Sequence, residues 1–337
     1  MWKALSCFVA AVALSVGACG EDSGRAASDH FVASRQPEKS FAPLLSLNGR
    51  ERAFPVSTSY FLRNSGLEWV GGPCPGLEID IAAGRNSLPL TGVKNLPRLQ
   101  ARRLGKEPAY RQRAVARGCA GYRSESFSSS QHTRVFDSED RPPGVYLNEG
   151  FNLDILTDYQ HGEKKLAPDG SLAGIPVYYA VERLDERRQL RVSYWLLFGR
   201  GEAIGPDGKT VVHEGDWERV DVVLRLRGRH RFTPVAVRYR VDSKMKVVPW
   251  TDVEHVGGTH PVVYIAPGSH TPYPHGDDTR KRLALRSWSR LRDVRREPWY
   301  GYGGGWGAFG FSDAESGPLG PSPYNLSSDT GMAPGGF

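Results

Sequence analysis

A long run of alternating side chains from Asp216 to Arg227 restricts the fold more than any other part of this 337-residue chain. Successive side chains of a β-strand point to opposite faces of the sheet, so the run divides into two series. One series ends in four aliphatic residues and is therefore the core-facing one, whereas the other is mostly charged. The core-facing series consists of Asp216, Glu218, Val220, Val222, Leu224 and Leu226.

Neighbouring segments share this β-branched and aromatic character, and their connections are too short for helical crossovers, which favours antiparallel pairing. Two stretches have helical spacing instead, at residues 57–67 and 279–294. The second stretch is basic, so a helix lying on a membrane surface is an alternative to one packed on the sheet. We expect a mainly β protein, an antiparallel β-sandwich with one or two peripheral helices. The other expected strands lie within residues 174–185, 189–199, 233–243 and 260–270.

The first 18 residues predict a lipoprotein signal peptide, because one Lys precedes an apolar run that ends in small residues. This segment is too short to be a membrane-spanning helix. The segment VGAC resembles a bacterial lipobox, which implies cleavage before Cys19 and acylation of its thiol. A plain signal peptide with an incidental Cys is the alternative. Residues 19–40 are polar and aperiodic, so we expect a flexible tether and a domain that is extracytoplasmic and lipid-anchored to a bacterial membrane.

The rest of the chain predicts one β-sandwich domain, residues 41–321, followed by a disordered tail at residues 322–337. Residues 71–144 are rich in Gly, Pro, Ser and Arg, and we interpret them as a loop-rich insertion. An oxidising compartment permits Cys74 and Cys119 to form a disulfide there, and two free thiols are the alternative.

The net charge is +7, and basic residues cluster within residues 94–123 and 280–296. In an exported protein such clusters indicate a partner such as anionic lipid, phosphate or glycan, and no nucleic acid, whereas the membrane is expected to be reached through the lipid on Cys19. A solvated basic surface without a ligand is the alternative reading.

Asp216 and Glu218 lie at the mouth of the core-facing series, where two carboxylates cannot both ionise without a compensating positive group. That group is a metal ion, an Arg or protonated His, or a shared proton. His213 lies upstream across Gly215, and His270 follows another expected strand, so both can reach this mouth. The cluster suits acid–base catalysis or a structural His–Asp hydrogen bond equally well. The cluster can also bind a divalent cation, Mg²⁺ or Ca²⁺, and the predicted ligands are then His213, Asp216, Glu218 and His270.

Three other sets of aromatic side chains are interpreted as follows from their position in the sequence. Trp217 points away from the acids, so we expect it to anchor the packing of the opposite face. The Gly-rich aromatic stretch 299–311 suits sugar stacking or headgroup insertion, or simply a folded loop that closes one end of the sandwich. His255 and His275 are interpreted as surface residues.

Two motifs in this order resemble the vacuolar protein sorting-associated protein 62 family: HEGDWE from His213, and HPVVYIAPGSHTPYP from His260. The likeness spans most of residues 41–321 and is weakest at residues 71–144. It implies no particular reaction.

The pattern His213-x-x-Asp216-Trp217-Glu218 is also similar to the heptapeptide core of necrosis- and ethylene-inducing peptide-like toxins. This resemblance implies a secreted β-sandwich that binds a divalent ion through such acids and a His, and that acts on membrane glycolipids. The toxins carry a second His directly before the Asp, where this chain has Gly215.

The sequence contains no Gly-x-Ser-x-Gly, phosphate-loop or His-Glu-x-x-His motif, and no catalytic residue can be assigned. We therefore favour a membrane-tethered lipoprotein whose divalent-cation site helps to bind anionic lipid or glycan. A metal-dependent extracytoplasmic hydrolase and a structural lipoprotein without a ligand site are the alternatives.

Overall fold

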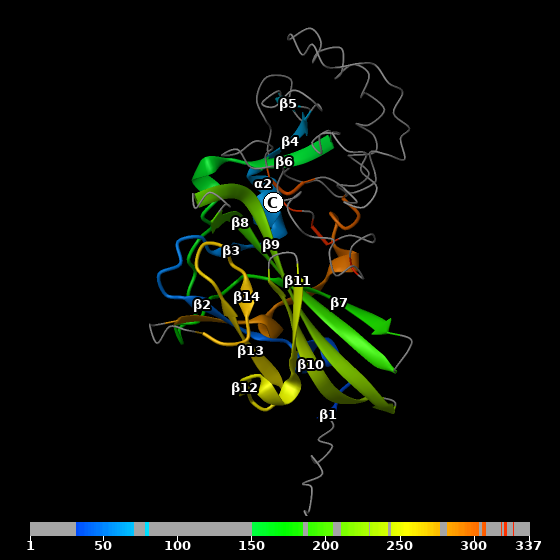
Figure 1. Cartoon of the computed structure of the whole chain (residues 1–337). Helices are drawn as coiled ribbons and strands as arrows, with labels where there is room; N and C mark the ends of the chain where they lie inside the picture. Colours follow the sequence, from blue (N-terminus) through cyan, green and yellow to red (C-terminus); the bar gives the residue numbers. More distant parts are fainter. Residues whose placement is uncertain are drawn as a thin grey trace, which may run out of the picture. The chain divides into compact units, whose positions relative to one another are not determined.

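The structure is a computed structural model, and most of the elements in the described part of the chain are β-strands (Figure 1). Cys19, Cys74 and Cys119 lie outside the described residues, as do the signal peptide, most of the tether and most of the expected insertion. Within the described residues, no helix has the length and apolar character needed to cross a membrane. The described residues are 32–70, 78–80, 150–184, 188–204, 210–228, 230–241, 244–276, 282–302, 305–307, 318, 320, 321 and 326.

An eight-stranded sheet forms the main layer, and its central strands are the long segments expected from the sequence. All its pairings are antiparallel except that of β16 with β7. The order along the sheet is β1 (Val32–Ala33), β10 (Arg231–Val241), β9 (Thr210–Gly228), β8 (Gln189–Ile204), β7 (Val177–Leu184) and β16 (Leu291–Asp293), with β11 (Lys244–Pro249) on β10 and β3 (Pro55–Val56) on β8.

A five-stranded sheet faces it, and a three-stranded sheet completes the mainly β fold, which confirms the expected fold class. Within the described residues, the two α-helices are short: α1 (Pro37–Ser40) and α2 (Thr58–Arg63). The five-stranded sheet holds β12 (His255–Val256), β13 (His260–Ile265), β2 (Leu44–Asn48), β15 (Arg282–Arg286) and β14 (Pro272–Tyr273). The three-stranded sheet holds β5 (Glu78–Asp80), β4 (Ser65–Val70) and β6 (Gly150–Ile155). Single 3₁₀ turns are η1 (Thr157–Tyr159), η3 (Trp250–Asp252), η4 (Ser287–Ser289) and η5 (Val294–Arg296).

The aliphatic series of β9 faces the core between the two larger sheets, as its alternation predicts. Val220 pairs with Tyr194 and Val222 with Val192, and all four side chains are buried in one apolar cluster. Leu45 and Val263 join this cluster from the five-stranded sheet. Burying each such side chain stabilises the fold by about 1.5–3 kcal/mol.

On the opposite face of β9, Trp217 is buried in a second apolar cluster. Trp217 packs there against Tyr178, Trp299 and Trp306, with ring centroids 5.7, 5.4 and 5.2 Å away. The expected packing role of Trp217 is therefore confirmed, and two aromatics of the 299–311 stretch close this core. Leu326, within the segment expected to be a tail, is also buried in this cluster.

The prediction of a helix within residues 279–294 is wrong. Its described part forms β15 on β2, then η4, β16 on β7 and η5. An apolar residue at every third position also fits short 3₁₀ turns between strands, where side chains three apart eclipse. Strand pairing with the two larger sheets decides between the two readings.

Candidate functional site

The first half of β9 carries the unusual acids, and a glycine turn sets their positions. Gly215 has φ +61°, and a Cβ on this residue would lie 1.4 Å from the carbonyl oxygen of Trp306. Only glycine fits both the left-handed backbone and this close approach. The turn leaves Asp216 paired with Phe198 and His213 paired with Gly201 on the neighbouring strand β8.

The missing side chain of Gly201 makes room for two of the predicted site residues. A Cβ there would lie 2.6 Å from Nε2 of His213 and 2.9 Å from Oδ2 of Asp216. His213 is buried, and its Nδ1 lies 2.9 Å from the carbonyl oxygen of Gly215, which it satisfies as the protonated nitrogen. The imidazole and the carboxylate therefore converge over the backbone of Gly201.

His270 joins this group from the loop between β13 and β14. Its Nδ1 donates to Oδ2 of Asp216 over 2.7 Å, and its ring stacks on Phe198 with centroids 3.6 Å apart and an interplanar angle of 4°. The side chain is fully buried, and φ is +52°, a backbone region that is uncommon for a residue with a side chain. The surrounding contacts hold it there.

Glu51 completes the cluster, and sequence reasoning missed it. Its Oε1 lies 3.7 Å from Nε2 of His270, a distance at which coulombic attraction dominates over hydrogen bonding. The same carboxylate accepts the backbone N–H groups of Arg52, Ala53 and Gly268. An acid in the turn after β2 was the only sequence signal, and no spacing links it to His270.

Glu51 and His270 shift each other's pKa, and Asp216 adds to the shift of His270. Burial alone would lower the pKa of His270, but its contacts with Asp216 and Glu51 outweigh burial and raise that pKa from 6.5 to about 8. Burial alone would raise the pKa of Glu51, but His270 and the N–H groups of Ala53 and Gly268 lower it from 4.5 to about 2. The cluster is therefore an imidazolium held between two carboxylates.

Glu218 does not join the other three predicted ligands. It lies one strand repeat beyond Asp216, opposite Leu196, and lines a narrow space between the two larger sheets together with Tyr194 and Ile265. Glu214, which was not predicted as a ligand, is buried on the other side, where it accepts from the backbone of Ile155. Across the part of the chain that the structure describes, no group of three or more His, Cys, Asp or Glu side chains is arranged to hold a metal ion.

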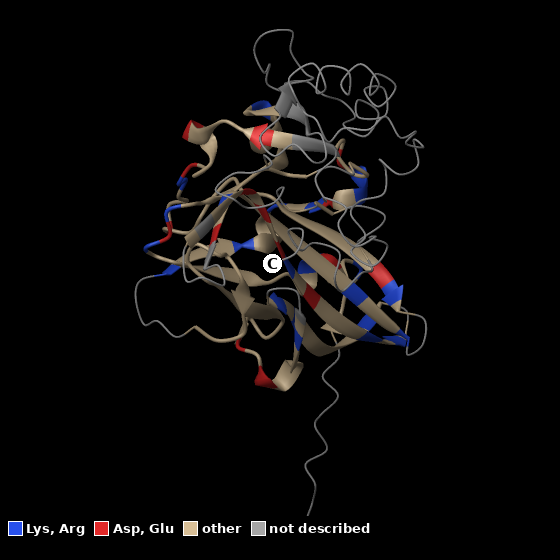
Figure 2. Cartoon of the chain, turned by 45° about the horizontal axis from the view of Figure 1, so that its top comes forward, with Lys and Arg blue, Asp and Glu red and all other residues tan. Residues whose placement is uncertain are grey.

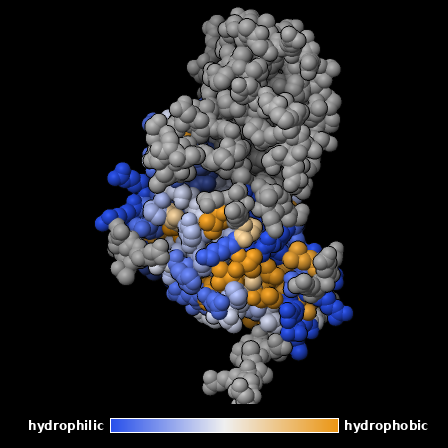
Figure 3. Space-filling view, in the orientation of Figure 1, coloured by the Kyte–Doolittle hydropathy of each residue, from blue (hydrophilic) through white to orange (hydrophobic). Residues whose placement is uncertain are grey.

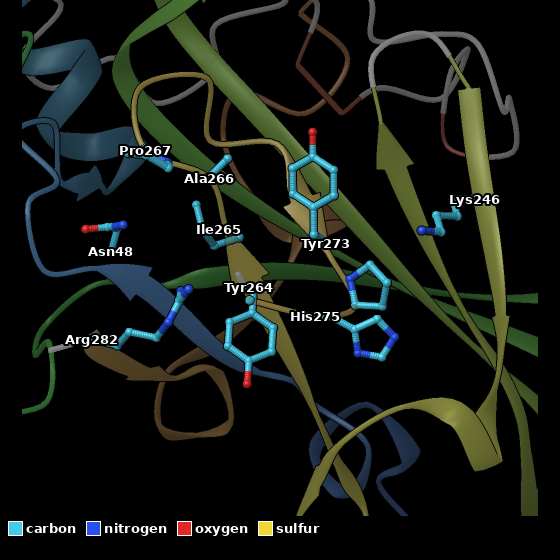
Figure 4. A pocket seen from close by; sticks show the side chains of 11 residues that line it. Asn48, Lys246, Tyr264, Ile265, Ala266, Pro267, Tyr273, His275 and Arg282 are labelled. Carbon is cyan, nitrogen blue, oxygen red and sulfur yellow. The ribbon is translucent and has the colours of Figure 1, made fainter. Parts of the chain in front are cut away.

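A cavity of about 470 Å³ opens beside this cluster, between β13, β14 and β11, and we call it the tyrosine pocket. Tyr264 and Tyr273 stand directly opposite each other on β13 and β14. Figure 4 shows them between Arg282 on one side and His275 and Lys246 on the other. The guanidinium of Arg282 lies 4.6 Å from the ring centroid of Tyr264. The remaining lining residues are Asn48, Ile265, Ala266, Pro267, Pro274 and Gly276.

Comparison with known proteins finds no matching family model and no matching curated protein, so the proposed relation to the vacuolar protein sorting-associated protein 62 family is unsupported by either. The structural neighbours are necrosis- and ethylene-inducing proteins. The protein NLPPya in complex with glucosamine shares 15% identity at a TM-score of 0.27 over 36% of this chain and 52% of its own.

Two further neighbours are equally distant. The non-toxic HaNLP3 protein shares 14% identity at a TM-score of 0.27, over 40% of this chain and 70% of its own. The necrosis and ethylene inducing protein 2 from the causal agent of cocoa's witches' broom disease shares 15% identity at a TM-score of 0.24, over 40% of this chain and 58% of its own. This chain thus spans about half the length of the first neighbour, and at these TM-scores the likeness carries no argument about function.

Proposed function

We propose that this chain is an exported, membrane-tethered lipoprotein that binds an acidic glycan in the tyrosine pocket. The observation that carries the proposal is the placement of two opposed tyrosines, Tyr264 and Tyr273, between cationic side chains. The lipid on Cys19 is the proposed membrane attachment, as the lipobox resemblance implies.

The pocket combines the two contacts that an acidic sugar needs. Tyrosine rings offer flat apolar surface for the C–H face of a sugar. Lys246 and Arg282 supply positive charge for a carboxylate or sulfate group. Tyr264 is fixed in place, because its hydroxyl donates to Glu254 and Arg282 covers its ring. The volume of the tyrosine pocket falls in the usual range for small-molecule sites.

Anionic lipid is the competing ligand. Figure 3 shows apolar and hydrophilic surface side by side on the face that carries β11 and β14, and Val247 and Tyr273 of those strands are exposed. A lipid headgroup would use the same cations, so the binding experiment contains a vesicle arm.

A hydrolase is the less favoured function, because the His270–Asp216 pair is sealed from solvent. A general acid or base must come within hydrogen-bonding distance of the substrate, whereas His270 is 0% exposed and its ring is stacked on Phe198 of β8. The cation expected from the sequence, Mg²⁺ or Ca²⁺, takes part in no step of the proposed binding, because His270 already supplies the positive charge beside Asp216.

The test is calorimetric titration of the full chain with oligogalacturonate and sulfated dimers, with a neutral glucan dimer and anionic vesicles as separate arms. We expect Tyr273→Ala and Lys246→Ala each to weaken binding of the acidic dimer about tenfold, which corresponds to loss of a ring or charged contact.

Matched controls are available at other surfaces. Tyr159 is 39% exposed against 36% for Tyr273, and Lys39 is exposed on α1, so Tyr159→Ala and Lys39→Ala should bind as the unaltered chain does. Binding to vesicles alone, or equal loss in the controls, contradicts the proposal.

A further inference from the structure

A second cavity, of about 260 Å³, lies on the other side of the β13–β14 loop, and we call it the arginine pocket. Three arginines and one histidine line it, together with Glu202. Arg50 and Arg52 come from the turn after β2, and Arg200 comes from β8. The full lining is Arg50, Glu51, Arg52, Ala53, His161, Arg200, Glu202, Pro267 and Gly268.

The arginine pocket carries excess positive charge. Arg200 pairs with Glu202 over 2.8 Å. Among the described residues, the side chains of Arg50 and Arg52, both exposed, have no hydrogen-bond or ion-pair partner. Glu51 does not neutralise them, because its carboxylate points inward to His270 and to backbone N–H groups. Two guanidinium groups are therefore left to attract an anion, and Arg binds carboxylate and sulfate in a two-pronged geometry.

The two pockets are adjacent, because Pro267 lines both of them. Asn48 of the tyrosine pocket and Arg50 of the arginine pocket are also two residues apart at the end of β2. Ala266 and Pro267 line the tyrosine pocket, and Pro267 and Gly268 line the arginine pocket, so the start of the loop Ala266–Thr271 forms the ridge between them.

Hydrogen bonds to the neighbouring elements fix this ridge in place. Gly268 donates its N–H to Glu51 and accepts from the N–H of Glu202 over 3.0 Å, while His270 at the base of the loop is tied to Asp216. A prefixed ridge keeps both pockets open without ligand, so little conformational entropy is lost on binding. The buried His270–Asp216 pair thus holds the loop that both pockets share.

We infer that the ligand is an acidic oligosaccharide that occupies both pockets, with one sugar on the tyrosines and a further acidic sugar across Pro267 at Arg50 and Arg52. This inference rests on the proposed function and deepens it, because a chain of repeating anionic units fits two neighbouring cationic pockets, whereas a single sugar fills one. Linking two contacts in one ligand raises affinity by making the second contact intramolecular.

The experiment measures affinity against chain length with the full chain, using dimers to hexamers of oligogalacturonate and of sulfated oligosaccharide. We expect at least a tenfold gain in affinity from dimer to hexamer in one series. The double variant Arg50→Ala/Arg52→Ala should lose that gain and still bind the dimer as the unaltered chain does. Removing two exposed arginines elsewhere, Arg35→Ala/Arg225→Ala, should leave both affinities unchanged.

The possible results separate the two proposals. Dimer binding that depends on Tyr273, with no gain at greater length, overturns the second pocket and leaves the proposed function standing. A length-dependent gain that survives the Arg50/Arg52 change, or is lost equally in the Arg35/Arg225 control, also overturns it, because general charge then explains the gain. No binding by any acidic saccharide overturns the proposed function itself.

Discussion

Nδ1 of His270 lies 2.7 Å from Oδ2 of Asp216, although 54 residues separate them in the chain. This hydrogen bond joins the loop between β13 and β14 to the turn that begins the core-facing half of β9. Glu51 approaches the other ring nitrogen, so both carboxylates compensate one buried imidazolium. The positive group that the inward-facing Asp216 requires is therefore present within the fold.

Asp216→Asn should destabilise the domain by about 3 kcal/mol, because it leaves His270 buried with only one distant counter-charge. Urea unfolding followed by tryptophan fluorescence measures the change. Asp169→Asn is the control: Asp169 forms an exposed ion pair with Arg286, and because water screens such a pair, its loss should change stability much less. Equal effects of the two substitutions would show that the buried pair contributes nothing special.

Stability should depend on pH in two windows set by the same cluster. The raised pKa of His270 makes its contribution full below pH 6.5 and lost as pH rises through about 8, a loss of about 2 kcal/mol. The lowered pKa of Glu51 makes its contribution full above pH 4.5 and lost as pH falls toward 2. We therefore expect this cluster to stabilise the domain most between pH 4.5 and 6.5.

Unfolding free energies of the unaltered chain and His270→Gln across this pH range check the assignment. The unfolding free energy of the variant should not fall as pH rises above 6.5, the ordinary pKa of the imidazole. An equal fall of the unfolding free energy in both proteins would show that groups other than His270 cause it.

Gly215→Ala should prevent stable folding or cost more than about 4 kcal/mol, because its Cβ would overlap the carbonyl oxygen of Trp306. Gly170→Ala is a matched control, since Gly170 also has positive φ, +77°, but a Cβ added there would have no neighbour within 4 Å. That substitution should cost only the backbone strain, about 1 kcal/mol. Similar losses at both sites would show that the close approach to Trp306 is not what requires glycine.

Removal of divalent cations tests the predicted metal site directly. Because His270 already compensates Asp216 and Glu51, we expect the same Tm in EDTA, Mg²⁺ and Ca²⁺, and no bound metal after dialysis. A Tm increase with either ion that disappears in both Asp216→Asn and His213→Ala would instead establish the cation at these residues.

The strands of the large sheet could be predicted from sequence because alternation is a local property. The inward register of Asp216 follows from counting along β9, and so does the outward placement of Trp217. The 279–294 stretch could not be predicted, because its three-residue repeat fits a helix as well as short turns, and pairing with β2 and β7 decided it. The place of Glu51 in the buried cluster could not be predicted either, since nothing in its own segment indicates that it is buried.

By itself, the sequence determined the β class, the core-facing register of β9 and the need for positive charge beside Asp216, because these depend on side-chain period and on the cost of burying a charge. Only the tertiary structure decided that His270 supplies this charge, that Glu218 lies apart, and that Tyr264, Lys246 and Arg282 share a pocket. Those relations join residues distant in the chain, and they arise when separate strands and loops pack together, which no local pattern encodes.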